Sequence, residues 1–450
     1  MIYLTLDLGF GDAGKGSLVD FLCRHEEAHT VVRYNGGAQA GHRVVTPSGV
    51  PDGVTDGCEH VFSQFGSGTL AGATTHLSRF MLVEPLAMMA EAAHLHELGI
   101  ADPFAALTID ENALLTTPFH RAVNRLKELA RGNGRHGSCG LGIGETAVDA
   151  LTHPRAVLRV GDLRYPDTLR AKLSFVQAIN LEKVMRLRPS LPDNEIVMQE
   201  LAVLEGSGWV DWLMEEYGRF STNAHIVPAS HLHQLLQCPG TVVFEGAQGV
   251  LLDEWVGFHP HTTWSNITFA NAETLLQEAN YSGTVTRLGL TRAYATRHGA
   301  GPFVSEDANL TRRLPDARNG QHLWQQGFRV GWLDLPLLHY ALDVVGGLDY
   351  LAVSCLDRVA DLPNIQLCTA YQHGNQRLER LNASPQPRDL AYQAQLTQLL
   401  HECRPILEQV VDPSALLDRL ASELGVPVGV VSWGETAVCK QFLFEIRQKP

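Results

Sequence analysis

A glycine-rich loop near the start of the chain contains residues that could bind and transfer phosphate. The segment Gly9–Ser17 reads GFGDAGKGS and lies between two apolar stretches, the first of them strand-like. Gly9, Gly14 and Lys15 match the G-x-x-x-x-G-K spacing of a phosphate-binding loop, in which backbone N–H groups and a helix N-terminus face phosphate oxygens. The expected nucleotide contacts in this loop are Gly11, Gly14, Lys15, Gly16 and Ser17.

Two residues of this loop differ from the usual pattern. Gly16 stands where a Mg²⁺-binding Ser or Thr is common, although Ser17 follows directly. Asp12 places a negative charge inside a loop that should bind anions. Such a charge is unfavourable unless the carboxylate holds a metal ion or takes a proton. The loop therefore indicates chemistry and not only nucleotide storage.

The composition disfavours several broad classes of function. The chain has 450 residues, of which 45% are hydrophobic and 19% charged, and its formal net charge is −14. This acidic balance disfavours a nucleic-acid-binding surface, which needs clustered Lys and Arg. No apolar run is long enough to span a bilayer, and the N-terminus does not resemble a signal peptide. The 8 cysteines form no C-x-x-C pair. We therefore expect a cytoplasmic protein with reduced thiols and with no nucleic-acid or membrane partner.

Alternating element types along the chain indicate an α/β fold. Apolar runs rich in β-branched residues predict buried strands, and each ends at a glycine-containing or polar loop. Ligands in open α/β sheets bind beyond the carboxyl ends of strands, so these loops are the expected site. We predict one large domain over residues 1–450, with a helical insertion at about residues 167–226. The predicted strands are Ile2–Leu8, Thr30–Arg33, Gly240–Phe244, Tyr350–Val353 and Val428–Ser432, and the predicted helices are Leu82–Leu98, Pro118–Ala130, Asn194–Tyr217 and Ala391–Val411.

Four further segments join the phosphate loop and together carry a family resemblance. They are residues 31–42 (VVRYNGGAQAGH), 244–253 (FEGAQGVLLD), 296–303 (TRHGAGPF) and 331–334 (GWLD). In content and order, these segments resemble adenylosuccinate synthetase over almost the whole chain. The resemblance implies a single α/β domain around a long mixed β-sheet, with a P-loop-like nucleotide site, acting as a homodimer. In that family a nucleoside triphosphate, normally GTP, phosphorylates the 6-oxygen of IMP, and the amine of aspartate then displaces the phosphate.

The resemblance also assigns roles to individual residues. Asp12 would be the base that removes the N1 proton of the purine, and His42 would stabilise charge on the transferring phosphoryl group. Asp12 and the backbone carbonyl of Gly41 would hold Mg²⁺. Lys15 would lie along the phosphates, and Gln248 would orient the purine through hydrogen bonds.

The segment that would bind guanine differs from the family pattern. The family's T-K-L-D is Ser354–Asp357 here, so Asp357 can still accept hydrogen bonds from guanine, but Cys355 replaces the lysine that covers the base. Ser432 and Gly434 match the second guanine contact, and the ET that follows replaces the usual proline-aspartate. GTP is the expected phosphoryl donor, with ATP as the alternative.

The segment that would bind the phosphate of the nucleotide substrate is also altered. The family's T-T-G-R-G-I-G is Ser138–Gly144 here, with Cys139 in place of a threonine and Leu141 in place of an arginine. Arg155 aligns with an arginine that crosses the family's dimer interface to this phosphate, and Thr263 fits another phosphate contact. The full set of expected substrate contacts is Gln39, Ser138, Cys139, Arg155, Gln248, Thr263, Arg297 and Arg329.

The loop that would bind the amine donor is altered most. The family carries threonines and several arginines before G-W-L-D, whereas residues 321–332 (QHLWQQGFRVGW) retain only Arg329. Two carboxylates need guanidinium forks for bidentate pairing. Trp324 and Phe328 make the loop more apolar, and either Arg297 or Arg329 is left to anchor a carboxylate. Our hypothesis is that the amine donor is not free aspartate or is bound differently.

Three classes of function follow from these observations. The first is a GTP-dependent carbon–nitrogen ligase of purine nucleotides, either with aspartate or as a paralogue with another oxo substrate and amine donor. The second is a nucleotide-binding switch or phosphohydrolase, and the third is an inactive scaffold. Retention of Asp12, His42 and Gln248 favours the ligase, because a switch does not need a substrate-activating set. A ligase releases phosphate only with its second substrate, a switch releases it without one, and a scaffold does not release it.

Overall fold

The central element of the fold is a long, mainly parallel β-sheet that crosses the molecule. The computed structural model describes residues 1–47, 57–316, 319, 324 and 327–443. Within these residues the sheet contains ten strands, and each pair of neighbours is parallel except the pair of the last two strands, β19 and β20, at one edge. In spatial order the strands are β20 (Lys440–Phe442), β19 (Val428–Ser432), β15 (Tyr350–Ser354), β11 (Val285–Arg292), β1 (Ile2–Asp7), β10 (Val242–Glu245), β2 (Thr30–Arg33), β5 (Thr74–Leu77), β7 (Leu107–Asp110) and β9 (His225–Val227).

All five strands predicted from the sequence are confirmed, as β1, β2, β10, β15 and β19. Every residue of β1, β2, β10 and β19 is buried. Parallel strands that are covered on both faces read as continuous apolar runs rather than as alternating patterns, which is why these segments were recognisable. The antiparallel edge strand makes the sheet a mixed one, as the family resemblance implied.

Helices cover both faces of the sheet and create two separate hydrophobic cores. Side chains alternate between faces along a strand. Tyr3 of β1 therefore packs with Leu18 and Leu22 of α1 (Lys15–His25), whereas Leu4 and Leu6 face the opposite core. That second core also contains apolar residues of α9 (Ala270–Glu278), α11 (Leu335–Val345) and α14 (Pro413–Leu424).

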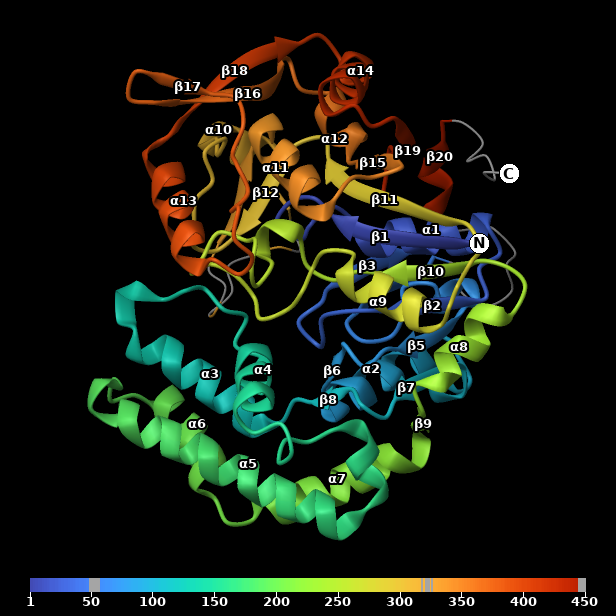
Figure 1. Cartoon of the computed structure of the whole chain (residues 1–450), viewed down its shortest axis with the longest axis vertical. Coiled ribbons are helices and arrows are strands. Elements are labelled where there is room, and N and C mark those ends of the chain that lie inside the picture. Colours follow the sequence, from blue (N-terminus) through green and yellow to red (C-terminus); the bar gives the residue numbers. More distant parts are fainter. Residues whose placement is uncertain (48–56, 317–318, 320–323, 325–326, 444–450) are drawn as a thin grey trace.

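A helical lobe adjoins one side of the sheet and has a core of its own. Figure 1 shows α3–α7 gathered below the sheet, in cyan to green. The predicted helix Pro118–Ala130 is confirmed as α3, whereas the predicted helix Asn194–Tyr217 divides into two helices. The break contains Gly206 and Gly208, which are poor helix formers. The helices are α2 (Pro85–Glu97), α3 (Pro118–Ala130), α4 (Ile143–Thr152), α5 (Pro166–Leu187), α6 (Glu195–Glu205), α7 (Trp209–Asn223) and, beside the sheet, α8 (Ser230–Gln237).

The prediction of one helix over Ala391–Val411 is wrong in its second half. Helix α13 (Leu390–Glu402) ends, and Arg404–Val410 forms strand β18. Pro405 lacks a backbone N–H and disfavours helical geometry at the residue before it, so the helix cannot continue. Strand β18 instead pairs in the antiparallel direction with β16 (Ile365–His373), which joins β14 (Leu333–Asp334) and β17 (Gln376–Leu378) in a smaller sheet.

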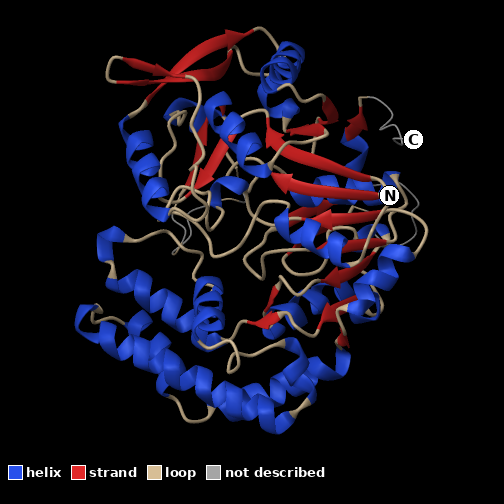
Figure 2. Ribbon diagram, in the orientation of Figure 1, coloured by secondary structure: helices blue, strands red, loops and turns tan. Residues whose placement is uncertain are grey.

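Short strands and loops occupy the edge of the main sheet where its parallel strands end. Figure 2 shows the arrowheads of these strands directed at the loops in the middle of the molecule. None of the described helices has both the length and the apolar character needed to cross a membrane. The remaining named elements are β3 (His42–Val45), β4 (Glu59–Phe62), β6 (Leu82–Val83), β8 (Leu114–Leu115), β12 (Ala295–His298), β13 (Phe328–Gly331), α10 (Ala308–Arg313) and α12 (Leu356–Ala360).

Candidate active site

A cavity of about 500 Å³ lies beyond the carboxyl ends of β1 and β10. Its walls come from the phosphate loop, the segment before β3, the loop between α3 and α4, and the long loop after β10. These segments are far apart in the sequence, and the parallel sheet brings them together at one edge. The cavity contains these residues that were predicted from the sequence: Gly11, Asp12, Gln39, Gly41, His42, Ser138, Cys139, Gln248, Thr263 and Arg297.

The phosphate loop is held in shape by a carboxylate that the sequence analysis did not single out. Asp7, the last residue of β1, accepts hydrogen bonds from the backbone N–H groups of Gly9 and Ala13, each at 2.7 Å. The Lys15 ammonium lies inside the loop, 2.7 Å from the Gly11 carbonyl and 3.3 Å from Asp7 Oδ2. Lys15 is therefore part of the loop's internal bonding in this structure, and its predicted contact with phosphates stays a prediction.

The structure gives a steric reason for the glycine at position 16. Strand β3 lies directly against this residue, so that a Cβ built on Gly16 would be 2.6 Å from the carbonyl carbon of His42 and 2.9 Å from the Arg43 carbonyl oxygen. Both atoms belong to the backbone and cannot rotate away. The Ser or Thr that is usual in phosphate loops is excluded here because His42 occupies its space.

We expect the substitution Gly16→Ser to displace His42, lower turnover sharply and destabilise the fold by about 1–3 kcal/mol, the usual cost of overpacking. Thermal unfolding and steady-state kinetics would measure both effects. Gly218→Ser in α7 is the matched control, because nothing lies within 4 Å of a Cβ at that position. Unchanged turnover in Gly16→Ser would show that the placement of His42 does not depend on this close contact.

His42 is oriented by a buried carboxylate. Its Nδ1 lies 2.6 Å from Oε1 of Glu245, the last residue of β10, and Ser67 donates to the same carboxylate from its backbone N–H at 2.9 Å and from its hydroxyl. Glu245 is completely buried and His42 is 5% exposed. The Nε2 atom of His42 is buried and has no hydrogen-bond partner among the described residues. Since His42 lines the cavity, this atom is available to a bound phosphoryl group.

The charges around this pair determine the proton on the imidazole. Burial lowers the pKa of His42 to about 4, and it outweighs the opposing effect of Glu245. Burial alone would favour a neutral Glu245, but Arg33 and His42 lower the pKa of that carboxyl to about 2. The ionised carboxylate accepts the Nδ1 proton and leaves the lone pair on Nε2. Sequence reasoning assigned no role to Glu245, although a charged residue at the end of an apolar strand was a usable signal.

The Asp12 carboxylate also has an unsatisfied atom. Its Oδ2 is buried without a hydrogen-bond partner in the described part of the chain, and His298 Nε2 lies 3.3 Å away as a possible charge partner. Oxygen ligands suit Mg²⁺, which needs only one or two carboxylates when phosphates and waters complete its shell. The Asp12 carboxylate and the Gly41 carbonyl therefore fit the predicted metal, even though the described residues contain no cluster of three or more His, Cys, Asp or Glu ligands.

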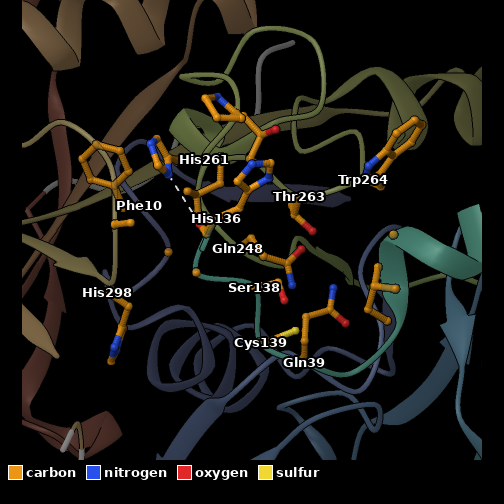
Figure 3. Close-up of a pocket in the computed structure, with 18 of the residues that line it drawn as sticks. Phe10, Gln39, His136, Ser138, Cys139, Gln248, His261, Thr263, Trp264 and His298 are labelled. Carbon is orange, nitrogen blue, oxygen red and sulfur yellow. Dashed lines mark hydrogen bonds between the residues drawn. The ribbon is translucent and has the colours of Figure 1, made fainter. Parts of the chain in front are cut away.

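Two glutamine amides point into the same cavity with unused donors and acceptors. The oxygen and nitrogen atoms of both Gln39 and Gln248 are buried without partners among the described residues (Figure 3). Gln248 also has a positive φ of 57°, which is uncommon for a residue with a side chain. Asn35 holds the backbone beside it by accepting from Ala247 N–H at 2.7 Å. Unpaired buried amides are costly, so this geometry suits a ligand with a polar edge such as a purine.

The remaining predicted substrate contacts are divided between the cavity and the surface. Ser138, Cys139 and Thr263 line the cavity, and Ser138 Oγ accepts from Asn124 Nδ2 at 3.0 Å (Figure 3). Arg155 is exposed on the loop after α4 and does not belong to the cavity wall. Its predicted contact with the substrate phosphate across a dimer interface stays a prediction.

The residues predicted to bind the nucleotide base gather beside the phosphate loop. Asp357 lies in the first turn of α12, after β15, while Ser432 ends β19 and donates to the Gly434 carbonyl at 2.9 Å. Ser17 donates to the Glu435 carbonyl at 2.8 Å, and Ser354 donates to the Ala13 carbonyl at 2.7 Å. These contacts join the two strand ends to the phosphate loop in one continuous surface.

Both candidate arginines donate to backbone carbonyls, and Arg329 is in addition paired with a carboxylate. Arg297 and Arg329 are direct cross-strand neighbours in β12 and β13. The Arg329 guanidinium is paired with Glu306 and also donates to the carbonyls of Gly299 and Gly301. Arg297 lines the cavity, where burial and the charge of Arg329 lower its pKa to about 9. Five residues of the predicted amine-donor loop, 321–323 and 325–326, lie outside the described residues.

Fold and site together define a nucleotide-dependent enzyme that activates its substrate by phosphoryl transfer, since a phosphate loop adjoins a buried histidine, a carboxylate and two buried amides that face the cavity. The family profile described as Adenylosuccinate synthetase matches residues 5–438, and the chain belongs to this family. Named adenylosuccinate synthetases are similar over nearly their whole length. One from a Synechococcus strain is 31% identical over 447 residues, covering 94% of this chain and 90% of the relative. One from Chlorobium chlorochromatii is 32% identical over 439 residues, covering 94% and 93%.

Solved structures share the fold. The fully ligated adenylosuccinate synthetase from Plasmodium falciparum superposes with a TM-score of 0.75 at 19% identity, covering 98% of this chain and 99% of that one. The succinoaminodeoxyadenylate synthetase of cyanophage S-2L, bound to dGMP and dATP, gives a TM-score of 0.58 at 16% identity, covering 98% and 95%. The single α/β domain around a mixed sheet is thereby confirmed.

Proposed function

We propose that this chain uses GTP to phosphorylate the 6-oxygen of an IMP-like purine nucleotide and then joins an aspartate-like amine at that carbon. One observation carries the proposal: Asp12 Oδ2, His42 Nε2 and the Gln248 amide are all buried without hydrogen-bond partners in the described part of the chain, and all belong to residues lining one cavity. Buried polar atoms without partners are costly in a folded protein. A purine and a phosphoryl group would satisfy all three.

The residues divide the chemistry between them. Asp12 takes the N1 proton of the purine, which makes O6 nucleophilic toward the γ-phosphorus. His42 interacts through Nε2 with the transferring phosphoryl group, and Glu245 keeps the imidazole in place. Gln248 and Gln39 orient the purine. GDP leaves as O6 bonds to the γ-phosphorus. The amine nitrogen then attacks C6 and gives up a proton, the C6–O6 bond breaks, and phosphate leaves with O6. Asp12 and Gly41 would hold Mg²⁺, which neutralises charge on the phosphates when it is bound.

The experiment that tests this function is phosphate release from GTP and Mg²⁺ with IMP, with and without aspartate, followed by mass spectrometry of the product. We expect phosphate release only when both substrates are present, together with a product of the mass of adenylosuccinate. Release from GTP alone would support a switch or phosphohydrolase instead, and ATP in place of GTP tests the alternative donor.

A second candidate function is a paralogue that accepts an amine other than aspartate. The observation that favours it is the pairing of Arg329 with Glu306 and two carbonyls, because this leaves the guanidinium little capacity for a substrate carboxylate. A screen of primary amines with GTP and IMP would distinguish the two. Saturation by aspartate at ordinary millimolar or lower concentration would rule the paralogue out.

The proposed assembly is a homodimer in which Arg155 reaches the substrate phosphate of the neighbouring subunit. Its support is the exposed position of Arg155 outside the cavity of its own chain. We expect Arg155→Ala to raise the KM for IMP about tenfold or more, by loss of a charge-assisted contact, with little effect on the KM for GTP. Mixing Arg155→Ala with Asp12→Asn should restore activity if the site is shared. A mixture that is no more active than the sum of the two variants measured separately would contradict a shared site.

The proposed compartment is the cytoplasm. None of the 8 cysteines, all of which lie in the described part of the chain, forms a disulfide, as expected for a reducing compartment. Fractionation of cells that express the tagged chain would test this placement.

A further inference from the structure

A buried lysine lies beneath the loop that is proposed to contact the base of GTP. Lys440 begins β20 and is the direct cross-strand partner of Ser432 in β19. Only 8% of Lys440 is exposed. Its side chain turns back under the loop that joins the two strands. The ammonium donates to the carbonyl of Thr436 at 2.9 Å and to those of Gly434 and Glu435 at 3.3 and 3.4 Å.

The three carbonyls account for the three N–H donors of the ammonium. Three consecutive carbonyls directed at one cation also orient the peptide planes of the loop. In a trans peptide the N–H group points opposite to the preceding carbonyl. The N–H groups of Glu435, Thr436 and Ala437 therefore point away from Lys440. The lysine thus determines which side of the loop presents hydrogen-bond donors.

Charged neighbours explain how the ammonium is tolerated in a buried position. Burial lowers the pKa of Lys440 to about 8, while the carboxylates of Asp20 and Asp357 act in the opposite direction. The group is mostly charged at neutral pH. Asp357 is the carboxylate proposed to accept hydrogen bonds from guanine, so the lysine charge acts on both parts of the proposed base site.

We propose that Lys440 is a positioning residue for the guanine base of GTP: it fixes the Gly434–Thr436 loop and supplies the positive charge next to Asp357. The inference rests on the proposed function. Cys355 stands where the family pattern has the lysine that covers the base, so that Lys440 brings an ammonium to this part of the site from near the other end of the chain. Ser17 bonds to the same loop and links it to the phosphate end of the site.

Direct titration of GTP in the absence of IMP and amine tests this role. We expect Lys440→Met to raise the Kd of GTP about tenfold or more, as expected for the loss of a charged hydrogen-bond donor. The KM for IMP and kcat at saturating GTP should stay within about twofold, and Lys440→Arg should recover part of the affinity. Gln441→Met on the same strand is the matched control, because Gln441 is exposed.

Two further measurements are the affinity of Lys440→Met for ATP and the affinity of Lys440→Gln for GTP. ATP binding should change less than GTP binding in Lys440→Met, and an equal loss for both nucleotides would overturn a role in positioning the base. Lys440→Gln keeps donors for the carbonyls and thereby protects folding, so it replaces Lys440→Met if that variant does not fold. Wild-type affinity for GTP in both variants would overturn the inference. Failure of the wild-type chain itself to bind GTP would overturn the proposed function instead.

Discussion

Asp12→Asn should lower kcat by about 10²–10⁴-fold, the usual contribution of a positioned general base, while leaving GTP affinity nearly unchanged. The amide has the size of the carboxylate but cannot take the N1 proton of the purine. The phosphate loop should keep its shape, because its internal bonds come from Asp7 and Lys15 and not from the Asp12 side chain. Single-turnover kinetics at saturating nucleotide would measure the effect.

A second role of Asp12 has to be separated from the first. Because the same carboxylate is proposed to hold Mg²⁺, the variant must be assayed at increasing Mg²⁺ until its rate no longer changes. Asp357→Asn is the matched control: it removes a carboxylate from the base end, so we expect a raised KM for GTP and a nearly normal kcat. Turnover of Asp12→Asn within a few fold of the wild-type rate would show that Asp12 is not the base.

The second large effect is expected at His42. His42→Asn should reduce kcat by about 10²–10³-fold, as for the removal of one hydrogen-bond donor to a developing charge, because Nε2 donates once bound nucleotide has favoured the charged imidazole. Glu245→Gln should cost less, about tenfold, because a glutamine oxygen can still accept the Nδ1 proton while the stabilising charge is lost. Since Glu245 acts through His42, the double variant should be no slower than His42→Asn alone. A fully additive double variant would contradict this dependence.

The low pKa of His42 predicts that GTP binding is coupled to the uptake of a proton. In the free protein the imidazole is neutral above about pH 4. A polyphosphate near Nε2 favours the charged form and raises this pKa. GTP binding near pH 6–7 should therefore take up a proton, and calorimetry in two buffers of different ionisation enthalpy would detect it. The uptake should be absent in His42→Asn, and equal uptake in both proteins would place the proton elsewhere.

The low pKa also predicts how stability depends on pH. In the unfolded chain the imidazole of His42 has an ordinary pKa near 6.5. Between about pH 6.5 and 4 it is therefore protonated in the unfolded state and neutral in the folded state. The free energy of unfolding should therefore fall as pH decreases from about 6.5 to 4. The pKa of Glu245 is about 2 in the folded protein, so protonation of this carboxylate lowers the free energy of unfolding further at more acidic pH. Denaturant titrations at several pH values, with His42→Asn for comparison, would measure this contribution.

Local features of the chain were sufficient to predict the frame of the fold. The strands β1 and β10 were recognisable because both of their faces are buried, which makes them continuous apolar runs. The order of the five motifs indicated the family that the comparison confirmed. Since the motifs follow parallel strands, the sequence also predicted that Asp12, His42 and Gln248 would share a site, and the structure places them in one cavity.

Other features depend on contacts between residues that are distant in the sequence. The partner of His42 is Glu245, 203 positions away. Arg329 was predicted as a substrate contact, but only the folded chain brings it to Glu306 across β12 and β13. Strand β18 was missed because its sequence continues a helical periodicity, and pairing with β16 outweighs that weak preference.

Spacing, glycine content and apolar runs act over a few residues, so they were enough to identify the chemical groups of this protein and the strands that end beside them. Which groups are satisfied and which are left for a ligand follows from the folded arrangement. Lys15 and Arg329 are bonded within the protein, whereas Asp12 Oδ2 and His42 Nε2 have no hydrogen-bond partner among the described residues. The physical reason is that hydrogen bonding and desolvation depend on all neighbours in space, and most of those neighbours come from distant parts of the chain.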